Sequence, residues 1–237
     1  MFDQTVAIKE VRNESADVKT FVLDAHADFK PGQFISVQLD IENCDERCNR
    51  RPFSIASSPT EKNLMIAMKF YPEPSAFKKR MAALQDSDII KIRGSMGNFV
   101  LDETKDAVML SGGIGITPLR SMIKYATDKK LQLKITLLYS NKTPGEIVYY
   151  RDLEEMQKAN KNLKVVHFVT RPEESKRPWN GETGRITADA IRKHAPDIKN
   201  TVFYICGPPA MAESLSAVLM EMDIDKENIK TEQFLGY

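Results

Sequence analysis

The sequence predicts two successive units, a small antiparallel β-barrel and then an α/β unit built on a parallel sheet. Three observations predict this order. The first hundred residues carry short alternating or β-branched segments separated by turn residues. Beyond residue 106, apolar strands alternate with segments of helix length, which is typical of a parallel sheet. A polar stretch, residues 102–106, lies between the two patterns, and we place the boundary near residue 103, with domains over 1–103 and 104–237.

The barrel is expected to have six strands, because six short segments show the alternation or β-branched content of strands. Turn residues such as Pro31 and Gly94 separate them. A short helix is expected over Ala76–Leu84, with Ser75 as its N-cap. The expected strands are Thr5–Arg12, Val18–Leu23, Phe34–Leu39, Arg51–Ile55, Leu64–Met68 and Ile89–Arg93.

The second unit is expected to hold a five-stranded parallel sheet with helices between the strands. Residues 170–184 form one long loop, and loops of that length are often functional. The expected strands are Val108–Leu110, Leu133–Tyr139, Leu163–Val169, Thr201–Cys206 and Ile229–Phe234. The expected helices are Pro118–Thr127, Arg151–Ala159, Thr187–Lys193 and Ala210–Met222.

Composition excludes several classes of partner. The 34 basic residues balance 33 acidic ones, so we expect no binding to nucleic acid. No segment approaches the roughly 18 apolar residues of a membrane span, and the N-terminus lacks a signal-peptide pattern, so we expect a cytoplasmic protein without a membrane span. Three cysteines make a disulfide framework improbable. Cys44 and Cys48, without neighbouring His, make a poor metal site, and we expect no metal.

The loop over residues 111–118 joins a short strand to a helix and suits a phosphate contact. Its three glycines let the backbone approach a ligand, and Thr117 is expected to cap the helix, with Pro118 at its first position. The free N–H groups of a helix N-terminus favour an anion. Tight packing alone can also explain such a loop. The glycines are Gly112, Gly113 and Gly115.

Two further segments have residues suited to a cofactor. Arg51, Phe53 and Ser54 offer a charge for pyrophosphate, a flat ring face and a hydroxyl. In a regular strand Arg51 and Phe53 lie on one side; the alternative is an exposed arginine beside a core phenylalanine. Residues 204–211 form a strand, a Gly-Pro turn and a helix, so Cys206 can face the crevice at the carboxyl ends of the strands, unless it is only a small buried apolar residue.

These motifs together resemble the ferredoxin–NADP reductase superfamily. Arg51-Pro52-Phe53-Ser54 resembles its flavin motif R-x-[Y/F]-S, and the glycine loop resembles its dinucleotide loop. Cys206-Gly207-Pro208-Pro-Ala-Met211 is similar to its C-G-P-x-x-M nicotinamide motif. Gly94-Ser-Met-Gly-Asn-Phe99 is similar to its turn closing the barrel, and Glu232-Gln-Phe234 to its carboxy-terminal E-x-F. The five motifs occur in the expected order and cover almost the whole chain.

The resemblance implies a Greek-key flavin barrel followed by a dinucleotide domain, with hydride passing from nicotinamide C4 to N5 of FAD. It implies that Arg51 neutralises the flavin pyrophosphate, that Phe53 packs on the isoalloxazine and that Ser54 bonds near N5. Cys206 would lie by the nicotinamide, and Glu232 would orient that ring or relay a proton. The resemblance also implies a cover for the opposite flavin face, supplied by Phe234 or Tyr237.

The sequence departs from the family pattern in two places. Phe53 replaces the commoner tyrosine and removes a phenolic hydrogen bond. Pro72-Glu-Pro-Ser75 has proline where the pyrophosphate loop expects glycine. A helix N-terminus can still meet a phosphate there, and Lys69 is an added cation or a solvated strand-edge lysine, so FAD stays favoured over FMN. The residues at that helix start are Ser75, Ala76 and Phe77.

The segment Ser140-Asn141-Lys142, followed by Glu146, leaves the choice of dinucleotide open. A 2′-phosphate favours a fixed cation, whereas a 2′-hydroxyl favours a carboxylate or amide. Lys142 and Asn141 therefore indicate opposite answers. Because no arginine adjoins Ser140-Asn141, we expect NADH rather than NADPH.

The sequence predicts an NAD(P)H-dependent flavoprotein reductase. Because the chain lacks the cysteine set of a plant-type iron–sulfur domain, we expect electrons to pass to an external redox protein, such as a ferredoxin or an oxygenase component. One alternative is an NAD(P)H:flavin reductase that uses free flavin as its substrate. Another is a non-catalytic flavin- or dinucleotide-binding subunit.

Overall fold

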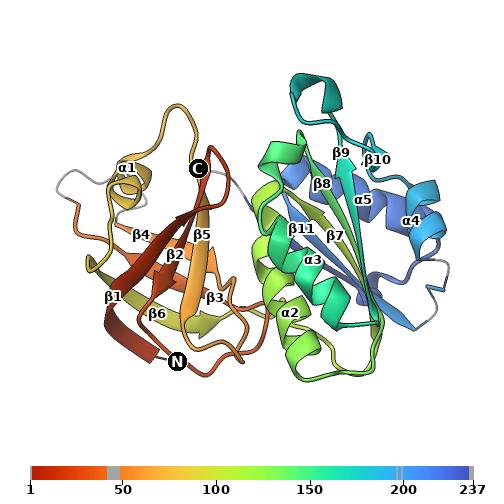
Figure 1. Cartoon of the computed structure of the whole chain (residues 1–237). Helices are drawn as coiled ribbons and strands as arrows, with labels where there is room; N and C mark the ends of the chain where they lie inside the picture. Colours follow the sequence, from red (N-terminus) through yellow and green to blue (C-terminus); the bar gives the residue numbers. More distant parts are fainter. Residues whose placement is uncertain (1, 42–48, 196, 199, 235–237) are drawn as a thin grey trace.

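A computed structural model describes residues 2–41, 49–195, 197–198 and 200–234 and has two units side by side (Figure 1). One is a six-stranded antiparallel sheet that is nearly closed into a barrel, and the other is a parallel sheet with helices on both faces. The predicted fold class is confirmed. The predicted boundary near residue 103 lies between the last strand of the barrel and the first strand of the parallel sheet, and it stays a prediction.

The barrel strands follow the order β4-β3-β6-β1-β2-β5, so β6 returns late in the chain to lie between β3 and β1. The two outer strands meet just beyond β4, where the N–H of Ala56 donates to the carbonyl of Met65 on β5 at 2.7 Å. The elements are β1 Phe2–Asn13, β2 Val18–Leu23, β3 Phe34–Gln38, β4 Arg50–Ser54, β5 Leu64–Lys69, α1 Ala76–Ala82 and β6 Ile89–Met96.

The short helix α1 begins where the sequence predicted. The hydroxyl oxygen of Ser75 accepts a hydrogen bond from the N–H of Lys78 at 3.4 Å, which satisfies one of the free amides of the first turn. Phe77 and Met81, one helical turn apart, are buried against the barrel core. That packing fixes α1 to the barrel.

The parallel sheet follows the order β10-β9-β8-β7-β11-β12. Five of these strands were predicted, and the sixth, β10, is a two-residue pairing that the long loop makes with the end of β9. Its strands are β7 Asp106–Gly112, β8 Ile135–Asn141, β9 Leu163–Val169, β10 Glu182–Thr183, β11 Thr201–Gly207 and β12 Ile229–Gln233. Its helices are α2 Ile116–Asp128, α3 Tyr150–Ala159, α4 Ala188–His194 and α5 Pro209–Glu221.

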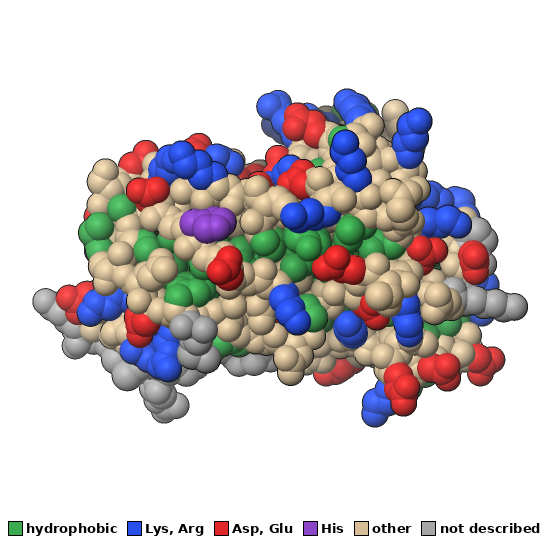
Figure 2. Space-filling view, turned by 90° about the horizontal axis from the view of Figure 1, so that it is seen from below, with side chains coloured by type: hydrophobic (Ala, Val, Ile, Leu, Met, Phe, Trp, Pro, Cys, Tyr) green, Lys and Arg blue, Asp and Glu red, His purple; other side chains and the backbone are tan. Residues whose placement is uncertain are grey.

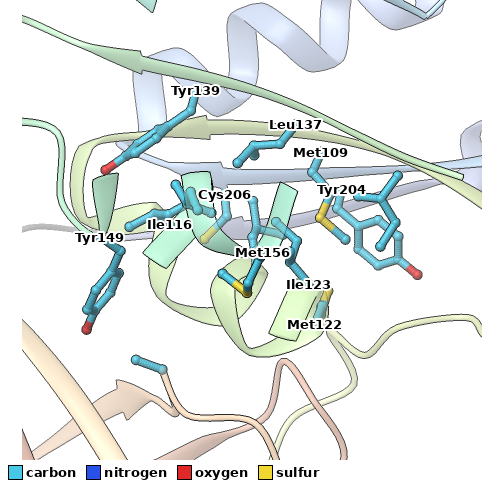
Figure 3. Close-up of a cluster of buried hydrophobic side chains, with 14 of the residues drawn as sticks. Met109, Ile116, Met122, Ile123, Leu137, Tyr139, Tyr149, Met156, Tyr204 and Cys206 are labelled. Atoms are coloured by element: carbon cyan, nitrogen blue, oxygen red, sulfur yellow. The ribbon is translucent and has the colours of Figure 1, made fainter. Parts of the chain in front are cut away.

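The helices α2 and α3 cover one face of the sheet, whereas α4 and α5 cover the other (Figure 1). The apolar cluster under α2 and α3 continues into the barrel, where Ala56, Met65 and Ala67 join it. Cys206 and Ile116 lie in the same cluster (Figure 3). Because one apolar core crosses the junction, burial of this surface from water stabilises the contact between the two units.

The surface agrees with the balanced composition. On the face shown in Figure 2, basic and acidic side chains are interspersed, and apolar side chains lie between them along the middle. Over the part of the chain that the structure describes, no helix combines the length and the apolar character needed to cross a bilayer.

Candidate functional site

A pocket of about 550 Å³ lies at the junction of the two units. Both units and the last described residues contribute to its wall, so residues far apart in the chain meet there. The barrel contributes Phe34, Arg50, Arg51, Pro52, Phe53, Ser54, Ala67, Met68, Lys69, Tyr71, Phe77 and Lys78. The parallel-sheet unit contributes Ile114, Thr117, Glu232, Gln233 and Phe234.

The barrel wall of the pocket is built on β4. Arg51 is 8% exposed, and its guanidinium lies 5.2 Å from the ring centre of Phe77. The ring of Phe53 stacks on the same Phe77 ring at 6.0 Å, so Arg51 and Phe53 point to one side as period two predicted. Burial of Arg51 contradicts the alternative of an exposed arginine. Ser54 is also buried and lines the pocket, beside its register partner Phe34 on β3.

The glycine loop is packed tightly against the end of β11. A Cβ at Gly115 would lie 2.3 Å from the carbonyl oxygen of Cys206, so only glycine fits there. Similarly, a Cβ at Gly112 would lie 2.4 Å from the sulfur of Met211. Gly113 differs, because a Cβ there would meet nothing within 4 Å, whereas its φ of +54° is a backbone conformation that favours glycine. The predicted dinucleotide loop and nicotinamide motif therefore meet, and a gap remains above Gly113.

Two details of the predicted helix start are wrong. A 3₁₀ turn at residues 113–115 leads directly into α2, which begins at Ile116. Thr117 is therefore inside the helix rather than its cap, and its hydroxyl donates to the carbonyl of Ile114 at 3.1 Å. Pro118 is the third helical residue instead of the first. Both changes follow from the extra turn, which starts the helical backbone earlier.

Glu232 and Cys206 are register partners in the parallel pair of β12 with β11. Burial raises the pKa of Glu232 to about 7, and its Oε2 has no hydrogen-bond partner among the described residues. Burial, and then the charge of Glu232, raise the pKa of the Cys206 thiol well above its usual value. The thiol is therefore protonated at neutral pH, and a carboxyl that titrates near neutrality reaches the pocket.

Lys69 lines the pocket and links the two units. Its ammonium lies 2.9 Å from a carboxylate oxygen of Asp17 and 3.3 Å from one of Glu146. Glu146 also accepts from the hydroxyl of Thr143 at 3.2 Å. This arrangement contradicts the alternative of a solvated strand-edge lysine. It also places Glu146, from the predicted ribose segment, beside the pocket wall.

Several predicted residues lie outside the pocket wall. Cys206 is fully buried behind the loop. The segment Ser140–Lys142 lies at the carboxyl end of β8, where Asn141, the last strand residue, is buried and Lys142 is exposed. Tyr237, Cys44 and Cys48 lie outside the described residues. The remaining predicted residues that do not line the pocket are Ser75, Ala76, Gly112, Gly113, Gly115, Pro118, Gly207, Pro208 and Met211.

Sequence reasoning missed some of the lining residues. Phe34 reaches the pocket because β3 pairs with β4, and no local signal gives that pairing. Lys78 lies three residues after the predicted N-cap Ser75, so the predicted helix start was the signal that could have identified it as a lining residue. Its ammonium lies 4.3 Å from the ring centre of Tyr71, which adds a cation to Arg50, Arg51 and Lys69 on the barrel side.

The residues present fit a flavin and a dinucleotide. The pocket has the volume of a cofactor site and aromatic faces, and a buried arginine stands at its barrel wall. Opposite these groups, the unpartnered carboxyl oxygen of Glu232 offers a hydrogen bond that no described residue takes. The open space above Gly113 lies at the start of the 3₁₀ turn that leads into α2, where the first N–H groups of the helical segment favour a phosphate.

Comparison with known proteins agrees with this geometry. An oxidoreductase FAD-binding domain model matches residues 5–101, and an oxidoreductase NAD-binding domain model matches residues 109–217. The glycine betaine monooxygenase reductase subunit of Chromohalobacter salexigens is 30% identical over 95% of this chain, which spans 62% of that relative. The sulfhydrogenase 2 subunit gamma of Pyrococcus furiosus is 30% identical over 85% of this chain and 70% of its own length.

Solved structures share the fold. The flavohem-like FAD/NAD-binding domain of nitric oxide dioxygenase from Vibrio cholerae superposes with a TM-score of 0.85 at 20% identity, over 98% of both chains. A ferredoxin NADP⁺ reductase from Neisseria gonorrhoeae with bound FAD and NADP gives 0.79 at 20% identity, over 99% of both. Fold, pocket and family models together define an oxidoreductase with an FAD-binding and an NAD-binding domain. The chain belongs to the ferredoxin–NADP reductase superfamily.

Proposed function

We propose that the protein oxidises NAD(P)H through bound FAD and passes the electrons to a separate redox protein. The observation that carries this proposal is the shared pocket, in which the β4 residues Arg51, Phe53 and Ser54 meet Thr117 and Glu232. When bound, the two cofactors supply two-electron transfer between a nicotinamide and a flavin ring. The protein contributes the placement of the two rings.

The residues have separate tasks in this proposal. Arg51 holds the flavin pyrophosphate by charge, and Phe53 with Phe234 packs against the ring system. The Ser54 hydroxyl donates a hydrogen bond to the flavin ring. Glu232 orients the nicotinamide or holds a proton, because its pKa of about 7 lets it do either near neutral pH.

The acceptor we propose is a ferredoxin-like protein or an oxygenase component. Support comes from relatives named as reductase subunits of a monooxygenase and as a subunit of a sulfhydrogenase, which are parts of multi-protein systems. As donor we propose NADH. Its support is that no arginine adjoins Ser140 and Asn141, because a ribose 2′-phosphate favours a fixed cation.

An absorbance spectrum of the purified protein, recorded without oxygen before and after addition of each dinucleotide, tests the reductase proposal. We expect a flavin spectrum that bleaches with NADH and more slowly with NADPH. Failure of both donors to bleach bound flavin contradicts the reductase assignment and favours a non-catalytic binding subunit. Faster bleaching by NADPH leaves the reductase assignment standing and overturns the choice of donor.

A second candidate, a reductase that uses free flavin as substrate, is favoured by one observation. Ser75 and Ala76, at the altered pyrophosphate loop, do not line the pocket, so a bound flavin would contact fewer residues of that loop than the family motif implies. Gel filtration separates the two candidates. Retention of FAD through the column supports the leading proposal, whereas a colourless protein that turns over only with added flavin supports the alternative.

A further inference from the structure

Arg120 is a buried cation outside the cofactor pocket, and all five of its N–H donors are hydrogen-bonded. Nη1 donates to the carbonyl of Ala56 and to Oε2 of Glu61, both at 2.9 Å, and Nη2 donates to Oε1 of Glu61 at 3.2 Å. Nε and Nη2 both donate to Oδ2 of Asp152, at 2.9 and 2.6 Å. The side chain is 5% exposed. Ala56 and Glu61 belong to the barrel, so one guanidinium fixes α2 to both the barrel and α3.

Arg120 is close in the sequence, directly or through its partner Ala56, to pocket residues of both units. On α2 it follows the pocket residue Thr117 by three positions, and Ala56, which it binds, follows the pocket residue Ser54 by two. The next residue of the helix, Ser121, donates from its hydroxyl to the carbonyl of Ser57 at 2.6 Å. Two consecutive residues of α2 therefore bind two consecutive barrel residues, which follow β4 in the chain.

The surrounding charges make this contact depend on the arginine. Glu61 and Asp152 approach the guanidinium from opposite units. A third carboxyl, Glu14, lies nearby: burial raises its pKa most, and the charge of Asp152 raises it further. The guanidinium also lies 5.1 Å from the ring centre of Tyr149, whose hydroxyl is 2.8 Å from that of Thr20 on β2. Without Arg120, the carboxylates of Glu61 and Asp152 would lose the guanidinium that binds both of them across the junction.

We propose that Arg120 is a positioning residue that sets how the glycine loop, residues 111–118, and the strand β4 are oriented toward each other. It does not line the pocket, so its effect is exerted through α2 and the segment after β4. The inference rests on the proposed reductase function for its kinetic consequence. A misplacement of about 1 Å between reacting groups can slow a reaction by about 100-fold, so a small rotation of the two units suffices.

The test uses stopped-flow reduction of the full-length flavin-loaded protein by NADH. Arg120→Met alone leaves two unpaired carboxylates and can fail to fold, so the main variant combines Arg120→Met with Glu61→Gln and Asp152→Asn, which removes the repulsion. We expect the limiting rate of flavin bleaching to fall about 10- to 100-fold, with the dissociation constants of NADH and FAD within about twofold of the parent. Arg120→Lys keeps the charge but loses the planar guanidinium, so its limiting rate should lie between those of the parent and the triple variant.

Lys124→Met is the matched control, because Lys124 lies one turn further along α2 and, among the described residues, forms its ion pair with Asp128 of the same helix, which keeps its hydrogen bond from Thr60 of the barrel. It should reduce flavin at the parental rate. A triple variant with the parental limiting rate, or with a loss confined to FAD affinity, overturns the positioning role.

Crystal structures of the parent, Lys124→Met and the triple variant report the arrangement of the two units without any turnover. We expect the parallel-sheet unit of the triple variant to be rotated relative to the barrel, so that groups across the pocket shift by about 1 Å, and Lys124→Met to keep the parental arrangement. If neither donor bleaches the parent, the reductase proposal fails, and the structures still decide the role of Arg120. An unchanged arrangement of the two units in the triple variant overturns it.

Discussion

Glu232 lies beside Cys206 as its register partner on the neighbouring parallel strand, and burial raises the pKa of both side chains. The carboxyl is the more useful of the two for chemistry, because a pKa of about 7 leaves it partly protonated at neutral pH. The thiol is fully buried behind the glycine loop and stays protonated. The pair therefore offers one titrating group at the pocket and one neighbour that stays neutral.

The first prediction concerns the stability of the protein as Glu232 ionises. Its folded pKa is raised, so the folded state loses stability as pH rises from about 4.5 to about 7, by at most about 3 kcal/mol. Glu232→Gln should remove this loss. Urea unfolding at pH 5 and pH 8 measures it, and an equal change in parent and variant would show that Glu232 ionises as freely in the folded protein as in the unfolded chain.

His167 should give the opposite pH dependence. Burial lowers the pKa of its imidazole to about 4, and neither ring nitrogen has a hydrogen-bond partner among the described residues. Stability is complete above pH 6.5 and falls as pH decreases toward 4, because only the unfolded chain takes up the proton easily. His167→Phe should lose less stability than the parent between pH 7 and pH 5 in thermal unfolding. If both lose the same amount, protonation of His167 is not the cause.

Gly115→Ala should disrupt the contact between the glycine loop and β11. The added Cβ would meet the backbone of Cys206, which cannot move aside cheaply, so we expect a loss of about 1–3 kcal/mol and weaker dinucleotide binding. Gly145→Ala is the control, because the nearest atom to its Cβ is 4.0 Å away. Chemical denaturation and NAD⁺ titration compare the two. Equal stability of both variants would contradict the tight packing.

The fold was largely predictable because its strand and helix signals are local. Val18–Leu23 and Leu163–Val169 were predicted with the bounds that the structure has, since apolar runs and flanking turn residues mark both ends. The error at Thr117 also has a local cause. The 3₁₀ turn through the glycines continues smoothly into α2, and a capping residue is then unnecessary.

Contacts across the junction could not be predicted. Arg120 and Glu61 are 59 positions apart, and Lys69 and Glu146 are 77 apart, so no spacing rule connects them. In the sequence each is one charged residue among many, and only the packing of the two units pairs them. The flavin and dinucleotide motifs were recognisable because they are short and continuous, but the pocket that joins them is a property of the tertiary structure.

Arg51→Ala should chiefly weaken flavin binding. Removal of a buried cation from a phosphate contact costs about 1.5–3 kcal/mol, so the dissociation constant of FAD should rise at least about tenfold. Fluorescence titration of the apoprotein with FAD measures the change. An unchanged dissociation constant would remove Arg51 from the pyrophosphate site.

Cys206→Ala should slow flavin reduction with little loss of flavin. The residue lies behind the loop on the dinucleotide side, so its removal changes the support of the nicotinamide rather than that of FAD. Stopped-flow mixing with NADH, together with the flavin content after gel filtration, separates the two effects. A rate equal to that of the parent would leave Cys206 with a packing role alone.

The central claim is that the barrel and the parallel sheet share one pocket in which a flavin ring meets a nicotinamide. A crystal structure of the protein grown with FAD tests this claim most directly. We predict density for the ring system between Phe53 with Ser54 on one side and Glu232 with Phe234 on the other. A flavin ring bound away from both pairs of residues would contradict the account.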